Sequence, residues 1–190
     1  MTRKYSNITG YLIAGGRSSR FGSDKRLVEY EGEPLLERAG RVMCEALGEL
    51  PVMVGNDVIP LSDQAWRVIT DARPEAGPLG GIVAALEDCS TDWVMALAVD
   101  LPLICCADLQ FLADACNDTA DVLTLSVDGR PEPLVALYRC QQAAFWRDKL
   151  DRNELSLTRS LDLVSWQAVM LEKTSRSLTN VNALSDFKSL

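Results

Sequence analysis

The stretch ITGYLIAGGRSSRFGSDK, residues 8–25, decides the fold of this chain. Its first part, residues 8–14, is mostly apolar and ends at Gly15 and Gly16. An apolar run that stops at a tight turn predicts a buried strand. The remainder, residues 17–25, is polar and carries several charges, so we expect a loop that leaves the end of this first strand.

Beyond this stretch, short apolar runs alternate with helical patterns. Further strands are predicted at 51–55, 66–69, 93–99, 121–127, 134–138 and 166–171. Helices are predicted at 34–48, 77–88, 107–116, 141–150 and 155–164. The run WVMALAV (93–99) is almost wholly apolar, as a strand covered on both faces requires. Strands separated by helices predict a doubly wound, mostly parallel α/β sheet, in one domain over 1–190 with a flexible N-terminus at 1–7.

The overall charge limits the classes of partner. The 190 residues carry a formal net charge of −8, and the pI is near 4.6. Nucleic acids and anionic membranes are bound by basic faces, so we expect neither. The first residues, MTRKYSNITG, lack the apolar run of a signal peptide, and no segment reaches the ~20 apolar residues of a membrane span. We therefore expect a cytoplasmic protein.

The absence of histidine excludes several kinds of chemistry. No Ser-His-Asp triad, Cys-His pair or histidine-ligated metal can be built from this chain alone. The six cysteines contain no C-x-x-C pair, which fits buried thiols better than a zinc site or a disulfide framework. The chemistry must therefore use carboxylates, amides, lysine, arginine, backbone dipoles or a metal held by oxygen.

Polar residues that follow strands are the best candidates for a site, because ligands of open α/β sheets bind beyond the carboxyl ends of the strands. The loop 15–25 combines Gly15, Gly16 and Gly22 with Arg17, Arg20 and Lys25. Glycines let backbone N–H groups approach phosphate oxygens, and the basic side chains offset the phosphate charge. The alternative is an ordinary loop with solvated charges. The loop lacks the spacing of a Walker A or a dinucleotide motif.

Asp100 is the carboxylate that ends the apolar strand 93–99. It can hold Mg²⁺ as an oxygen ligand beside the glycine loop, or it can serve as a helix N-cap or turn aspartate before Pro102. The segment GPLGG (77–81) predicts a helix N-terminus that faces a ligand, or else close helix–sheet packing. Asn180 and Asn182 place two amides on one side of an extended segment, or in a turn.

Four segments together resemble the molybdenum cofactor guanylyltransferase family (molybdopterin-guanine dinucleotide biosynthesis protein A) within the larger nucleotidyltransferase group. LIAGGRSSRFGSDK (12–25) is similar to the family pattern L-A-G-G-x-S-x-R-M-G-x-D-K, and GPLGG (77–81) is similar to G-P-L-x-G. AVDLP (98–102) is similar to its strand-end D-x-P, and NVNALSDF (180–187) to N-V-N-T-P-x-D-L. The resemblance implies the Rossmann-like nucleotidyltransferase fold.

The resemblance also implies roles for individual residues. Nucleotide binding falls on Ile13, Ala14, Gly15, Gly16, Gly22, Lys25, Asp71, Gly77 and Asp100. Catalysis falls on Arg20, Lys25 and Asp100, the metal side on Asp100 and Asn182, and the acceptor side on Asn180 and Asn182. The segment RPEPLVALY (130–138) is similar to a family strand on the acceptor side, so Arg130 and Pro133 are weaker candidates there. The family's guanine-side asparagine aligns at Gly55, one position before Asn56, which bears on the choice of base.

The implied reaction is attack by the phosphate of molybdopterin on the α-phosphorus of GTP, with Mg²⁺ as cofactor and pyrophosphate as leaving group. It implies that cofactor-delivering proteins and apo-molybdoenzyme chaperones are protein partners. Two alternatives stay open. One is transfer from CTP or another nucleotide to a different phosphorylated acceptor, and the other is a catalytically silent nucleotide-binding module. A hydride-transferring Rossmann enzyme is disfavoured, because the required glycine spacing is missing.

Overall fold

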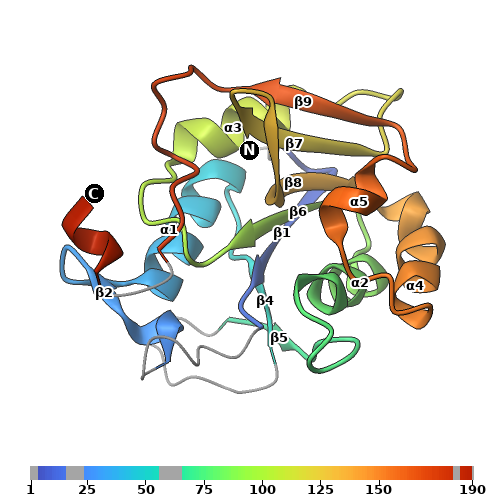
Figure 1. Cartoon of the computed structure of the whole chain (residues 1–190), viewed down its shortest axis with the longest axis horizontal. Coiled ribbons are helices and arrows are strands. Elements are labelled where there is room, and N and C mark those ends of the chain that lie inside the picture. Colours follow the sequence, from blue (N-terminus) through green and yellow to red (C-terminus); the bar gives the residue numbers. More distant parts are fainter. Residues whose placement is uncertain (1–3, 16–23, 56–65, 182–184, 190) are drawn as a thin grey trace.

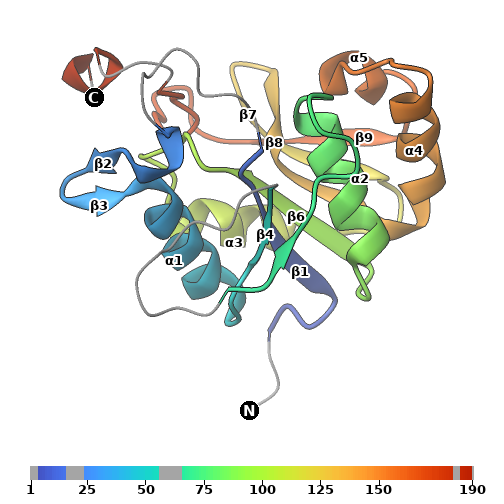
Figure 2. The same ribbon diagram turned by 90° about the horizontal axis from the view of Figure 1, so that it is seen from below.

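The computed structural model describes residues 4–15, 24–55, 66–181 and 185–189 (Figures 1 and 2). Within these ranges one seven-stranded sheet has the order β5-β4-β1-β6-β8-β7-β9. Its strands are β1 (Ile8–Ile13), β4 (Val52–Val54), β5 (Val68–Ile69), β6 (Trp93–Ala98), β7 (Val122–Val127), β8 (Arg130–Arg139) and β9 (Trp166–Met170). A separate hairpin is formed by β2 (Glu29–Tyr30) and β3 (Glu33–Pro34).

Helices cover both faces of the sheet, which confirms the predicted doubly wound architecture (Figure 2). One face carries α1 (Leu35–Leu47) and α3 (Cys106–Asp114). The other face carries α2 (Pro78–Asp88), α4 (Ala143–Asp151) and α5 (Leu157–Leu161). Short 3₁₀ turns are η1 (Lys25–Leu27), η2 (Cys140–Gln142) and η3 (Asp186–Ser189). No helix in the described ranges has the length and apolar character needed to cross a bilayer.

The central strand β6 shows why the apolar runs form this sheet. All six of its side chains are buried, and they alternate between the two faces. Met95 and Leu97 pack towards α1 and α3, whereas Val94 and Ala96 pack towards α2 and α4. Successive side chains of a strand point to opposite faces, so a strand covered on both sides must be apolar throughout.

Strand β8 runs against the direction of the others. It pairs antiparallel with both β6 and β7, while the remaining neighbours pair parallel. The turn from β7 to β8 is made by Asp128 and Gly129, both with positive φ (52° and 73°), as a two-residue hairpin loop requires. As a result, the beginning of β8 at Arg130 lies at the edge where the parallel strands end.

Most predicted elements are confirmed, and the differences have local causes. The strand predicted at 134–138 begins four residues earlier, at Arg130, because pairing with β7 continues past a bulge near Thr124 and Ser126 despite the two prolines. The predicted helix 155–164 is confined to 157–161. The hairpin β2–β3 was not predicted, because its short polar strands show no apolar alternation.

The N-terminal segment contacts the body of the fold where it is described. Tyr5 is buried, and its hydroxyl donates a hydrogen bond of 2.8 Å to Asp114 Oδ1 at the end of α3. Ile8 N donates to Tyr5 O at 3.1 Å, so the turn leads directly into β1. The extent of the domain over residues 1–190 stays a prediction.

Replacement of a central side chain should cost far more stability than replacement of an exposed one. Leu97→Ala removes a fully buried side chain of β6 and should lower the free energy of unfolding by about 2–5 kcal/mol. Leu163→Ala is the matched control, because Leu163 is 62% exposed and should change stability by less than about 0.5 kcal/mol. Urea denaturation measures both; equal losses would contradict the central position of β6.

Candidate active site

The carboxyl ends of adjacent strands bring the candidate residues to one edge of the sheet. Ala14 N, just after β1, donates to Val54 O of β4 at 3.1 Å. Gly55 N, just after β4, donates to Ile69 O of β5 at 3.0 Å. The backbone after β1, β4 and β5 is therefore continuous with the sheet. This is the edge at which doubly wound sheets bind ligands.

An ion pair joins the end of the glycine loop to the end of β6. Lys25 Nζ lies 2.7 Å from Asp100 Oδ2, although the two residues are 75 positions apart in sequence. Both side chains are mostly shielded from solvent, with 15% and 21% of their surface exposed. Lys25 begins η1, which Asp24 caps by accepting a 3.0 Å hydrogen bond from Arg26 N. This short turn positions the backbone of Lys25 next to Asp24.

One oxygen of Asp100 is buried without a protein partner. Asp100 Oδ2 accepts from Lys25, but Asp100 Oδ1 is inaccessible and accepts no hydrogen bond from any described residue. A buried polar atom without a partner is costly, and in native structures it commonly marks a position for a ligand, an ion or a water molecule. The geometry therefore distinguishes Asp100 from an ordinary turn aspartate.

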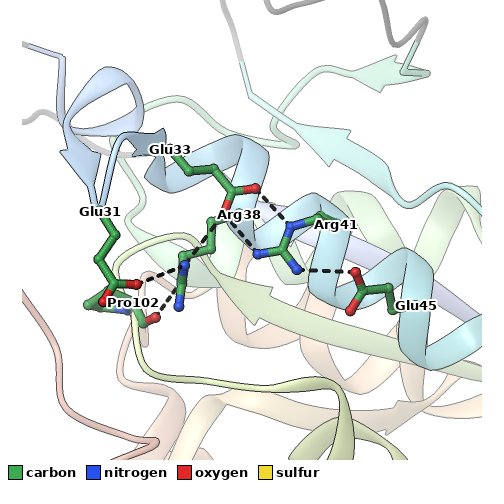
Figure 3. Close-up of polar contacts among 6 residues, drawn as sticks. All are labelled: Glu31, Glu33, Arg38, Arg41, Glu45 and Pro102. Atoms are coloured by element: carbon green, nitrogen blue, oxygen red, sulfur yellow. Dashed lines mark hydrogen bonds and ion pairs between the residues drawn. The ribbon is translucent and has the colours of Figure 1, made fainter.

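A network of arginines holds the loop after Asp100 (Figure 3). Arg38 of α1 donates from Nε to Pro102 O at 2.7 Å and lies 3.5 Å from Glu33 of the hairpin. Arg41 binds both oxygens of Glu33, at 2.9 and 2.8 Å. The bidentate geometry is the strong form of this interaction. Together these contacts connect α1, the β2–β3 hairpin and the loop that follows Asp100.

The C-terminal segment is attached to the same two regions. Val181 N donates to Asp100 O at 2.9 Å, so Asn180, the residue before Val181, lies near Asp100 in the fold. Further on, the ring of Phe187 stacks on Tyr30 of β2, with 5.7 Å between centroids. Figure 1 shows the C-terminal end beside β2. The described residues of the C-terminal segment therefore contact the loop after β6 and the β2–β3 hairpin.

Asp71 occupies a tight position between the end of β5 and the start of α2. Its side chain is buried, and Oδ1 accepts a 2.9 Å hydrogen bond from Arg73 N. A Cβ atom on Gly80 would collide with this carboxylate, and one on Gly15 would lie 3.1 Å from Asp71 Oδ2. Burial raises the pKa of Asp71, and the Arg73 N–H opposes that rise only in part. The two glycines therefore make room for the carboxylate.

The N-terminus of α2 faces this edge without a side-chain cap. Gly77 is the N-cap residue, and its backbone has φ 67° and ψ −157°, a conformation available essentially to glycine alone. Pro78 then starts the helix, as expected at a first helical position. Uncapped N–H groups and the positive end of the helix dipole favour a bound anion.

A pocket of about 400 Å³ lies between the β7–β8 turn and the chain that follows β9. Its lining residues are Val127, Asp128, Arg130, Pro131, Glu132, Ser175, Leu178 and Thr179. Thr179 is two residues before Val181, which binds the Asp100 backbone. The pocket is therefore a neighbour of the Lys25–Asp100 pair.

Comparisons with known proteins identify the family of this chain. The family model described as MobA-like NTP transferase domain matches residues 10–164. The chain belongs to this family. A relative from Chloroflexus aggregans, named "Probable molybdenum cofactor guanylyltransferase", is 33% identical over 192 residues, which covers 95% of this chain and 92% of the relative. The MobA-like chain is accordingly an enzyme of the nucleotidyltransferase class.

Two solved structures share the fold of this MobA-like chain. Molybdopterin-guanine dinucleotide biosynthesis protein A from Archaeoglobus fulgidus aligns with a TM-score of 0.74 at 23% identity, covering 96% of this chain and 95% of that one. CMP:2-keto-3-deoxy-manno-octonic acid synthetase, solved with CTP, aligns at 0.73 and 13% identity, covering 97% and 96%. Both likenesses show the fold of this chain.

The structure brings together most of the residues singled out in the sequence. The carboxyl edge holds Ile13, Ala14, Gly15, Lys25, Asp71, Gly77, Asp100, Arg130 and Asn180. Gly16, Arg17, Arg20, Gly22 and Asn182 lie outside the described residues. Pro133 is buried, and its carbonyl accepts the Tyr138 hydroxyl at 2.7 Å, which is a contact within the fold.

Two residues at this edge were missed. Arg38 resembles any other charge on an amphipathic helix, and only the tertiary contact with Pro102 reveals its position. Glu132 lies between two prolines, where the apolar pattern predicts no strand and the family resemblance points only to Arg130 and Pro133. The i, i+2 spacing of Arg130 and Glu132 was the available signal, because residues two apart on a strand share a face.

Replacement of Asp71 by asparagine should stabilise the fold near neutral pH. The folded-state pKa of Asp71 lies above its ordinary value of 3.8, so the stability linked to this group is complete below about pH 4 and is lost as pH rises through the folded pKa. Asp71→Asn avoids the buried charge and keeps an acceptor for Arg73 N–H. The free energy of unfolding should exceed that of wild type at pH 7, and the gain should shrink towards pH 4.

Urea denaturation across this pH range measures the effect. Asp118→Asn, at an exposed aspartate, is the control and should show no such pH-dependent gain. If Asp71→Asn is less stable than wild type at pH 7, the folded protein stabilises the ionised carboxylate of Asp71.

Proposed function

We propose that this enzyme transfers GMP from GTP to the phosphate of molybdopterin, forming the guanine dinucleotide cofactor and releasing pyrophosphate. The observation that carries the proposal is the Lys25–Asp100 pair, because it places a cation and a carboxylate with a free buried oxygen beside the glycine turn after β1. Nucleotidyl transfer requires this combination of positive charge for phosphates and an oxygen ligand for a metal.

The nucleotide is proposed to lie over β1, β4 and β5. The backbone at Ile13, Ala14 and Gly15 ends β1 and supplies N–H groups close to the triphosphate. Gly77, at the uncapped start of α2, adds the positive end of a helix dipole. Asp71 lies between these two elements and is the nucleotide-side carboxylate. Gly16, Gly22 and Arg20 complete the loop in the proposal.

Lys25 has two alternative partners in this mechanism. In the nucleotide-free protein its ammonium group neutralises Asp100 at 2.7 Å. A triphosphate carries more negative charge than one carboxylate, so Lys25 can turn to the phosphate oxygens and stabilise the charge that develops on them. Asp100 Oδ2 then becomes available together with the unpartnered Oδ1.

The residues fit a Mg²⁺ ion held mainly by substrate. Magnesium prefers oxygen ligands and is usually held by one or two carboxylates plus phosphates and water. Among the described residues no group of three potential metal ligands occurs, whereas Asp100 offers one carboxylate with a free buried oxygen. Asn182 is the second proposed ligand. When bound, Mg²⁺ supplies positive charge at the α-phosphate.

No general base is needed. The attacking group is a phosphate oxygen, which is already an anion at neutral pH, so the chain must position two anions and screen their repulsion. Lys25 and Arg20 serve that purpose on the nucleotide side, with Arg130 and Asn180 on the acceptor side. A chain without histidine can therefore perform the reaction. Cofactor-delivering proteins and apo-molybdoenzyme chaperones are the proposed protein partners.

One observation favours a second candidate, transfer from CTP or another nucleotide. Gly55 stands where the family has its guanine-side asparagine, and a Cβ at Gly55 would lie 3.7 Å from the guanidinium of Arg26. Arg26 is held by Asp24 through contacts of 2.9 and 2.6 Å. A guanidinium near the base position donates hydrogen bonds but accepts none, so it can contact the carbonyl oxygen of guanine or of cytosine.

The choice of base is tested by thermal shift with GTP, CTP, UTP and ATP, each with Mg²⁺. A ligand at about 100 times its Kd stabilises the native state by about 2.7 kcal/mol, or roughly 5–10 °C for a chain of this length. We expect the largest shift with GTP. A larger shift with CTP or UTP would keep the reaction class and replace the substrate, and no shift with any triphosphate would contradict the proposed nucleotide site.

Substitutions of Lys25 and Asp100 should have different effects on binding and turnover. Lys25→Ala should weaken triphosphate binding and lower turnover, whereas Asp100→Ala should chiefly remove Mg²⁺-dependent turnover while the protein stays folded. Pyrophosphate release with GTP and molybdopterin measures turnover, and thermal shift measures binding. The loss should reach at least about 100-fold in kcat/KM for each variant.

The matched control is another lysine–aspartate pair of the same chain. Lys4 and Asp114 lie 2.9 Å apart but are exposed, so Lys4→Ala should leave turnover unchanged. Wild-type activity in Lys25→Ala or Asp100→Ala would remove that residue from the catalytic site.

A further inference from the structure

Glu132 is a carboxylate at the site to which neither the sequence nor the comparisons assign a role. It lies near the start of β8 and lines the 400 Å³ pocket together with Arg130. Both residues reach this pocket from the first part of β8. Their position in the antiparallel strand places them at the same edge as Asp100.

The Glu132 carboxylate is not neutralised within the described residues. Its Oε1 accepts a 3.2 Å hydrogen bond from Leu134 N, and no described lysine or arginine forms an ion pair with it. Burial raises the pKa of Glu132, and the negative charge of Asp100 raises it further. A partly buried carboxylate with no cation, facing a pocket, favours a ligand that brings hydrogen-bond donors.

We propose that Glu132 binds the 2-amino-4-oxopyrimidine edge of the pterin in the acceptor, an inference that rests on the proposed function. This edge presents two parallel donors, the ring N3–H and the 2-amino group. A carboxylate accepts both at once, with one oxygen for each donor. Leu134 N–H occupies a single lone pair of Oε1, so both oxygens retain the capacity to accept.

The rest of the pocket suits the same ring. Its volume lies within the usual range for small-molecule sites. Val127, Pro131 and Leu178 provide apolar surface for the faces of a flat heterocycle. Arg130 makes no ion pair with a described residue, and it can donate to the oxygen or ring nitrogens on the opposite edge of the pterin.

Guanine carries the same donor edge, but the strand order favours the pterin. The glycine turn and Asp71 follow β1 and β5, which lie on one side of β6. Glu132 belongs to β8, on the other side of β6. Strands are about 4.8 Å apart, so β8 lies about 10 Å from β1 and about 19 Å from β5. A base held near β4 and β5 is therefore beyond the reach of Glu132.

Exchange of the carboxylate for an amide provides a sharp test. Lumazine differs from pterin by a 2-oxo group in place of the 2-amino group. Wild type should bind 6-hydroxymethylpterin at least tenfold more tightly than 6-hydroxymethyllumazine, measured by fluorescence titration. Glu132→Gln should lose about tenfold to a hundredfold in pterin affinity, because one acceptor becomes a donor. The variant should also shift the preference towards lumazine, because the glutamine amide can donate a hydrogen bond to its 2-oxo group.

Two controls separate this role from others. Asp128→Asn changes the other acid of the pocket, which is exposed and lies 3.4 Å from Lys173, and should leave the pterin preference unchanged. Thermal shifts with GTP and with ITP, which lacks the 2-amino group, should differ by the same amount in wild type and Glu132→Gln. A changed GTP-to-ITP difference would assign Glu132 to guanine and overturn the proposal. Equal binding of the two pteridines to wild type, or binding of neither, would also overturn it.

Turnover distinguishes failure of this inference from failure of the proposed function. Pyrophosphate release from GTP with molybdopterin tests the reaction in wild type, independently of the pteridine titrations. If the reaction proceeds but Glu132→Gln keeps the wild-type pterin preference and KM for molybdopterin, only the role of Glu132 fails. If the preference switches as expected but wild type releases no pyrophosphate, the pterin site stands and the transfer reaction fails.

Discussion

The ion pair between Lys25 and Asp100 is the contact on which the arrangement of the site depends. It joins the segment after β1 to the segment after β6, and it is mostly withdrawn from water, so both charges need each other in the ligand-free protein. The surrounding contacts keep the pair in place. Arg38 holds the loop after Asp100 through Pro102, and Val181 binds the Asp100 backbone from the C-terminal segment. Four parts of the chain thus meet around one pair of opposite charges.

Strand order explains why two substrates can meet at this pair. After β1 the chain crosses through α1 to β4, whereas β6 lies on the opposite side of β1, so the sheet has its topological switch point between β1 and β6. Ligands of doubly wound sheets bind at such a point. The reversal of β8 then adds a strand whose beginning, not its end, reaches the same edge. Asp100 consequently stands between a nucleotide side and an acceptor side in the proposed reaction.

Residues at the ends of apolar strands could be predicted from the sequence, because one pattern fixes both the strand and the edge where it ends. Asp100 was found in this way, and Asp71 was assigned by the family resemblance. Residues whose position depends on contacts between distant elements could not. Arg38 acquires its place from Pro102, and Glu132 becomes part of the edge only because β7 and β8 pair past two prolines and a bulge. Asn182 and the middle of the glycine loop remain predictions from the sequence.

Three carboxylates at the site are poorly stabilised in the ligand-free protein, and this makes an acidic chain compatible with anionic substrates. Asp71 is buried, Asp100 has an unpartnered oxygen, and Glu132 has no cation among the described residues. Each of these features costs stability without a ligand. In the proposed reaction Asp100 binds a metal ion and Glu132 accepts hydrogen bonds from the pterin. Lys25 exchanges its carboxylate partner for the phosphates. Ligand binding then offsets the free-energy cost of these unsatisfied groups. A preorganised site differs in this respect from a surface optimised for stability alone.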